Sequence, residues 1–101
     1  MNQINIIGRA VSDPEIRYTQ GGKAISKVTI AVNNKYKKDE AYFFDTQSWD
    51  KTAELIAEHI RKGDQIGITG ELQQQTWEKE GKKQSKVIIN IESITFVGKK
   101  S

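Results

Sequence analysis

Strict alternation between aliphatic and polar or small residues over 24–32 is the pattern that most constrains the fold. Side chains of a β-strand point to opposite faces in turn, so this pattern predicts a strand with one buried face. The same spacing recurs before and after this segment. It predicts an aliphatic core built from Ile4, Ile6, Val28, Ile30, Val32, Ile66, Ile68, Val87, Ile89 and Ile91.

The remaining strands and one helix follow from the same kind of pattern. Extended segments are expected at 2–8, 16–19, 24–32, 42–49, 64–77 and 87–97. Asp13-Pro14 interrupts the first of these, and Gly21-Gly22 supplies a tight turn. A helix is expected after Asp50, whose carboxylate is placed to cap it, and Gly63 is expected to end it after Arg61 and Lys62. Its apolar residues recur at helical spacing as Ala53, Ile56, Ala57 and Ile60.

A chain of 101 residues has room for one core, so residues 1–101 are expected to form a single domain. With 2–8 and 16–19 counted as one strand that Asp13-Pro14 interrupts, the segments make five strands, and the helix lies between the third and the fourth. This order indicates an all-β fold, a five-stranded Greek-key barrel of the OB type. Within this barrel Leu72 is expected to point inward with Ile66 and Ile68. Tyr42 and Phe44 are also expected to face the core, and 78–83 to form a hairpin loop.

Several classes of protein are disfavoured by what the chain contains. It has no cysteine and no apolar run of the roughly 20 residues that a membrane span needs, which fits a cytoplasmic protein. The one histidine, His59, has cationic neighbours, and the carboxylates are scattered among lysines. We therefore expect neither an enzyme, nor a metal site, nor a bound cofactor.

Four aromatic residues stand apart from the aliphatic core. Tyr36, Phe43, Trp49 and Trp77 lie in polar, lysine-bearing segments, and strand parity places the last three on the face opposite the core. Nucleobases have flat faces and their backbone is anionic, so exposed aromatics among cations suit stacking of a single strand. The sequence predicts a surface for single-stranded nucleic acid on these four residues.

The cations are more informative in their distribution than in their number. The net charge is only +3, but lysines gather in two candidate hairpins. One group surrounds Tyr36, and the other follows Trp77 as Lys79, Lys82, Lys83 and Lys86.

Several short motifs, taken in order, resemble the bacterial-type single-stranded DNA-binding protein family over essentially the whole chain. The segment 13–18, Asp-Pro-Glu-Ile-Arg-Tyr, resembles the D-P-E-x-R-Y segment of that family. The segments 4–9 and 28–33 resemble its first two strands, 51–63 its helix, and 70–72 with Trp77 its fourth strand.

This resemblance implies an OB-fold, assembled as a homotetramer, that binds and protects single-stranded DNA in replication, recombination and repair in the bacterial cytoplasm and nucleoid. It leaves a phage or plasmid origin open. The base-stacking positions of the family fall on Tyr36, Phe43, Trp49 and Trp77. Phosphate contacts fall on Lys51, Arg61 and Lys62, with Arg9 as an addition, while charge and position add the loop lysines Lys35, Lys79, Lys82, Lys83 and Lys86.

The chain departs from the family in three respects. Gln73, Gln75 and Asp45 stand where many relatives carry cations, and Phe44 replaces a histidine near the subunit interface of some relatives. The sequence ends at 98–101 with neither a flexible linker nor an acidic tip, so recruitment of other proteins through such a tail is not expected.

Two other functions share this fold. A primosome-type accessory OB protein would be dimeric and would bind single strands more weakly. An OB-type protein–protein adaptor would use the exposed aromatics as interface hot spots and would show no salt-dependent binding of DNA.

Overall fold

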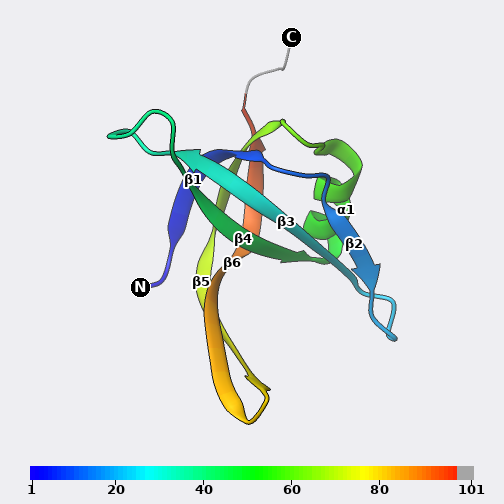
Figure 1. The fold of residues 1–101 in the computed structure, drawn as a ribbon. Helices are drawn as coiled ribbons and strands as arrows, with labels where there is room; N and C mark the ends of the chain where they lie inside the picture. The colour runs from blue at the N-terminus through cyan, green and yellow to red at the C-terminus, as the bar shows by residue number, and fades with distance from the viewer. Residues whose placement is uncertain (98–101) are drawn as a thin grey trace.

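The computed structural model describes residues 1–97, so the end of the chain at 98–101, where the sequence predicts no acidic tip, lies outside the described residues. Within residues 1–97, six strands and one helix follow one another (Figure 1). In order they are β1 (Ile4–Ala10), β2 (Glu15–Tyr18), β3 (Ala24–Asn33), β4 (Ala41–Trp49), α1 (Asp50–His59), β5 (Gln65–Lys79) and β6 (Lys82–Phe96).

The strands close into a barrel. Their order in the sheet is β1-β5-β6-β4-β3-β2, and a further pairing of β1 with β3 joins the two sides. Among the described strands β2 pairs with β3 alone, so the closed ring is made by β1, β3, β4, β5 and β6. Counted in this way, α1 lies between the third and the fourth strand. The prediction of an all-β OB barrel is confirmed.

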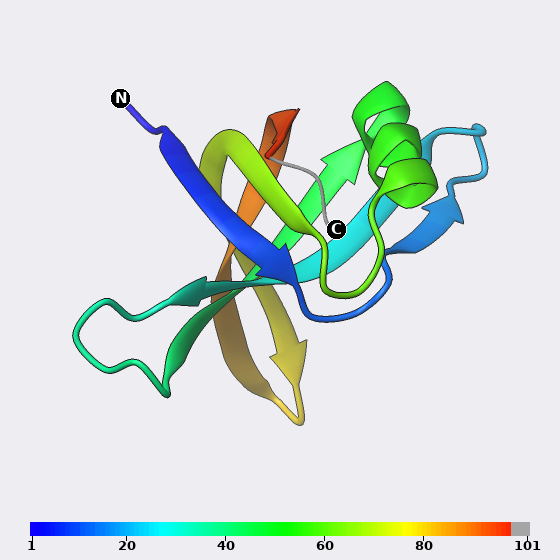
Figure 2. The ribbon, with the colours of Figure 1, turned by 90° about the horizontal axis from the view of Figure 1, so that it is seen from above.

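The barrel is filled by the aliphatic residues that the alternation predicts on one face. Ile30 of β3 and Ile66 of β5 are fully buried, and Ile56 and Ile60 reach them from α1 and the residue after it. Figure 2 shows α1 beside β3 and β4 at one end of the barrel. Burial of these side chains supplies the main driving force for the fold, at roughly 1.5–3 kcal/mol for each fully buried aliphatic residue.

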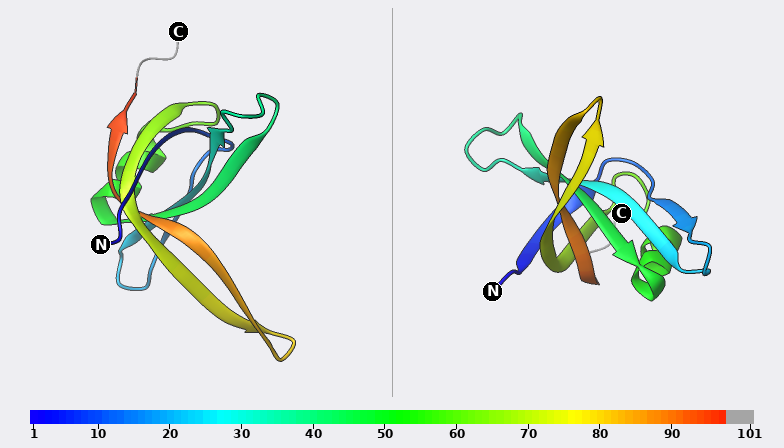
Figure 3. Two further views of the ribbon diagram at one scale, coloured as in Figure 1. Left: turned by 90° about the vertical axis from the view of Figure 1, so that its left-hand side faces the viewer. Right: turned by 90° about the horizontal axis from the view of Figure 1, so that it is seen from below.

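β5 and β6 extend far beyond the barrel as a two-stranded arm (Figures 1 and 3). Its strands run to Lys79 and from Lys82, where the sequence predicts a longer loop. The turn holds only Glu80 and Gly81, with φ of 53° and 77°. Two positive φ values in a two-residue loop define a type I′ turn, whose twist matches that of the strands.

The arm corrects two predictions about the core. Leu72 and Val87, both expected to point inward, are exposed. The pairing between β5 and β6 shifts register at Thr69/Gly70, where the pairing of β5 with β1 also ends. β6 remains in the barrel through Ile89, which is buried and pairs with Thr46 of β4, but β5 beyond the bulge has lost its neighbour β1, so the parity that holds for Ile66 and Ile68 does not bury Leu72.

A third correction concerns Tyr42, which is exposed although its parity faces the core. It pairs with Val32 close to the loop between β3 and β4, where the two strands run out of the barrel. Phe44, two residues further along, is partly buried and packs against the core as expected.

The ends of α1 also differ from expectation. Trp49 is the N-cap and makes no side-chain capping bond; Asp50 is the first helical residue, with φ of 56°. β4 runs into α1 without a loop, so Asp50 makes the sharp change of direction instead of capping. The helix ends at His59, before the predicted stop at Gly63. Within residues 1–97, no helix is long and apolar enough to cross a membrane.

Candidate nucleic-acid interface

The outer face of β3 and β4 carries two of the predicted aromatics. Residues directly opposite in antiparallel strands share a face, so the pairing of Phe43 with Ala31 and of Trp49 with Ile25 places both rings on this surface. Phe43 is 64% exposed and Trp49 is 40% exposed. Exposed aromatic area of this size is available for stacking, so the outward parity predicted for these two residues is confirmed.

The arm carries the third ring. Trp77 of β5 is 44% exposed and pairs with Gln84, and the same face of the arm continues through Gln75 and Lys86 toward the barrel. Lys86 reaches Asp45 on β4, so this face of the arm is turned toward the face that holds Phe43 and Trp49. Three of the predicted aromatics therefore lie around one surface.

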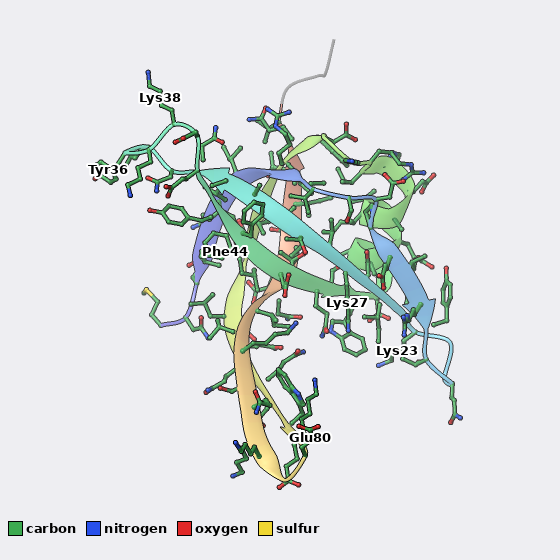
Figure 4. The ribbon with its side chains drawn as sticks, in the orientation of Figure 1. Lys23, Lys27, Tyr36, Lys38, Phe44 and Glu80 are labelled. Carbon is green, nitrogen blue, oxygen red and sulfur yellow. The ribbon has the colours of Figure 1, made fainter. Side chains whose placement is uncertain are left out.

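The fourth ring stands apart, on the loop between β3 and β4. Tyr36 is 83% exposed, and its backbone N–H donates to the Asn34 side chain at 2.9 Å, which shapes the turn. The Lys35 ammonium lies 5.9 Å from the centre of the Tyr36 ring. Figure 4 shows Tyr36 and Lys38 at the outer end of this loop and Glu80 at the tip of the arm. The four predicted aromatic residues therefore extend from the loop between β3 and β4 to the arm.

A polar groove of about 410 Å³ lies between the arm and the β3–β4 face. It is lined by Ser12, Asp13, Glu15, Lys27, Val28, Thr29, Asp45, Thr46, Gln47, Gln75, Lys86 and Ile88. The Lys86 ammonium donates to Asp45 Oδ2 at 3.1 Å, and the Thr29 hydroxyl donates to Asp45 Oδ1 at 2.9 Å. The bond from Lys86 holds the pKa of Asp45 below its ordinary value, and the bond from Thr29 acts in the same direction to a smaller extent. Partial desolvation opposes both bonds without cancelling them.

The predicted phosphate contacts fall into two groups. The first group has exposed side chains on the loop, the helix, the residues after it and the arm, and consists of Lys35, Lys51, Lys62, Lys79, Lys82 and Lys83. Members of the second group already contact other parts of the chain. Arg9 donates to the Gly63 carbonyl at 2.9 Å, and Lys86 contacts Asp45.

Arg61 belongs to this second group. Its guanidinium donates to the Ala57 and Ile60 carbonyls at 2.7 and 2.8 Å, where it satisfies the last turn of α1. A cation at a helix C-terminus also interacts favourably with the helix dipole. The structure thus gives Arg61 a stabilising role that spacing alone does not reveal.

Lys27 also lines the groove, although the sequence pattern does not predict it as a site residue. Alternation places it outward, but it has no aromatic neighbour in sequence. Its pairing with Gln47 on one side and with Glu15 on the other sets it in the groove beside Asp45. Only the strand register brings these residues together. Within residues 1–97, no three His, Cys, Asp or Glu side chains lie close enough to hold a metal ion.

A closed five-stranded barrel with aromatic rings around a polar groove on its outer face defines an OB-type binding domain. Comparison with known families identifies it further: the chain belongs to the single-strand binding protein family, whose model matches residues 1–97.

Individual relatives agree with this assignment. Single-stranded DNA-binding protein 1 of Synechocystis sp. is 38% identical over an alignment of 104 positions, which covers 99% of this chain and 86% of that protein. The single-stranded DNA-binding protein of Aquifex aeolicus is 38% identical over an alignment of 105 positions, which covers 98% of this chain and 71% of the relative. That of Treponema pallidum is 34% identical over 103 residues, but the chain spans only 58% of its length.

Proposed function

We propose that this protein binds single-stranded DNA largely without regard to sequence and protects it during replication, recombination and repair. The observation that carries the proposal is the exposure of Phe43, Trp49 and Trp77 around one groove. Every base offers a flat face to such rings, whereas a duplex hides these faces between base pairs. Membership of the single-strand binding protein family supports the same function. Binding of this kind needs neither a catalytic group nor a cofactor.

The cations complete this proposal. The exposed ammonium groups of Lys35 on the loop and of Lys79 and Lys82 on the arm suit the phosphates of a strand lying across the aromatic face. Lys83 pairs with Glu78 on the other face of the arm, so it would reach a phosphate only around the edge of the arm. Lys51 and Lys62 extend this track past α1. Arg9, Arg61 and Lys86 join it only by exchanging or sharing their present partners, so we expect smaller contributions from them.

Titration with oligo-dT at two salt concentrations tests the proposal. We expect quenching of tryptophan fluorescence, because Trp49 and Trp77 stack on bases. We also expect the logarithm of the affinity to fall with the logarithm of salt, at about 0.7 in slope per phosphate contacted.

A duplex of matched length is the control, since it offers phosphates without base faces and should produce little quenching. Folded protein that shows no quenching with oligo-dT contradicts the proposed stacking. Absence of any salt-dependent binding would favour the adaptor function instead.

We further propose that the active form is a homotetramer. A monomer of 11.4 kDa offers a short track for DNA, and it exposes apolar surface away from the aromatic face. A second groove of about 460 Å³, on the outer side of β1, β5 and β6, includes Ile7, Gly67, Thr95 and Val97, and Ile7 is exposed. Association of several chains through such a surface would lengthen the DNA track.

Light scattering at micromolar concentration measures the assembly directly. We expect a mass four times that of one chain, and a smaller mass for Ile7→Glu, because a carboxylate there would have to be desolvated in the interface. A mass of two chains would favour the primosome-type alternative. The mass of a single chain would contradict both the tetramer and the dimer.

A further inference from the structure

The groove between the arm and the β3–β4 face lacks the excess of cations that would draw in phosphate. Three acidic residues line it, Asp13, Glu15 and Asp45, against two cations, Lys27 and Lys86. One of these cations is already bonded to Asp45. Arg17 lies 3.8 Å from Glu15, so acids and cations balance around the groove, in a chain whose net charge is +3. The groove therefore attracts phosphate less than the lysine-bearing loop and arm do, and its polar groups suit the bases of the strand better.

The polar groups in the groove suit the edge of a base. The Asp45 carboxylate is about half exposed, and each of its oxygens accepts one bond, from Thr29 or from Lys86, which leaves acceptor capacity on both. The Gln47 and Gln75 side chains line the same space. Their amides can donate or accept, whereas the ionised carboxylate can only accept.

A hydrogen-bond acceptor discriminates between pyrimidine bases by the group at ring position 4. Cytosine carries an amino group at this position, and a carboxylate is a known partner for that donor. Uracil and thymine carry a carbonyl oxygen at the same position, which repels a carboxylate and donates no bond to it. A purine amino group, as in adenine, is a donor of the same kind.

We propose that Asp45 is a specificity-determining residue, which favours bases with an amino group over bases with a carbonyl at the same position. This inference rests on the proposed binding of single-stranded DNA and refines it. Stacking remains tolerant of sequence, and Asp45 adds a modest preference at the base that enters the groove.

Oligo-deoxycytidine and oligo-deoxyuridine provide the test, since their rings are equal in size and neither carries a methyl group. The quantity to measure is the ratio of their dissociation constants, first in the wild type and then in Asp45→Asn. We expect the preference for deoxycytidine to fall on the order of fivefold in the variant, as for loss of a partly exposed bond to a charged group.

The ratio of the two dissociation constants separates an effect of Asp45 on base preference from an effect of its charge, because the charge acts on both oligonucleotides alike. Asp45→Asn also frees Lys86, which adds about one phosphate contact and steepens the salt slope by about 0.7 for both oligonucleotides alike. The matched variant Lys86→Gln removes the cation and leaves the carboxylate, so it should keep the preference. Asp45→Ser, with thermal melting by circular dichroism as a check of folding, repeats the test with a smaller side chain.

Each result decides between two roles for Asp45. An unchanged ratio in Asp45→Asn, with tighter binding of both oligonucleotides, would overturn the inference and leave Asp45 as a group that only weakens phosphate contacts. In that case the proposed binding of single strands would stand. If neither oligonucleotide quenches the wild-type protein, the proposed function itself fails, and the inference fails with it.

Discussion

Trp77→Ala should weaken binding of oligo-dT by about 1–3 kcal/mol, which is roughly 5- to 150-fold in the dissociation constant. The ring stands on the arm and is 44% exposed, so its loss removes a stacking surface without opening a cavity in the core. Trp49→Ala should have an effect of the same size, because Trp49 presents its ring on the β3–β4 face that Lys86 of the arm contacts.

A matched control lies on the same arm. Val87 is exposed and pairs with Gln74, on the face of the arm opposite to Trp77. Val87→Ala should leave the dissociation constant for oligo-dT unchanged. If Trp77→Ala and Val87→Ala have equal effects, then the groove-side face of the arm is not where the strand binds.

Ile30→Ala should lower the free energy of unfolding by about 2–5 kcal/mol, which is large beside the 5–15 kcal/mol total of a typical domain. Ile30 is 0% exposed, and its neighbours across the sheet are Ala10 and Phe44. Truncation leaves a cavity that the closed barrel cannot collapse to fill. Denaturant unfolding, at one protein concentration in case association contributes, measures the change.

Val87→Ala is again the control, since a change at an exposed position away from special features is usually within 0.5 kcal/mol. A loss below about 1 kcal/mol for Ile30→Ala would mean that the barrel repacks around the missing atoms, contrary to the closed core described above.

Local pattern predicted the barrel because most residues that form it follow one rule, the alternation of side chains along a strand. Ile30, Ile66 and Ile68 are buried, and Phe43 and Trp49 are exposed, as their parity predicts. The rule fails where strands run out of the barrel, at Tyr42 near the loop between β3 and β4 and in β5 beyond the bulge at Thr69/Gly70. Leu72 keeps the spacing of a core residue, but β5 has lost its neighbour β1 there.

The contacts within the candidate site could not be predicted from local pattern. Lys86 and Asp45 are 41 residues apart in sequence, and Arg61 resembles a phosphate ligand until its guanidinium is seen against the carbonyls of α1. The sequence alone indicates that Asp45 weakens a phosphate contact. In the structure its carboxylate is hydrogen-bonded and lines a groove.

The sequence by itself determined which side of each barrel strand meets water, because side-chain alternation is a property of a single strand. It therefore determined the aliphatic core, the outward placement of Phe43 and Trp49, and the family. Only the tertiary structure decided where the arm leaves the barrel, which cation meets Asp45, and which residues line the groove. Those features depend on register and on closure between strands distant in the chain, and no local pattern encodes them.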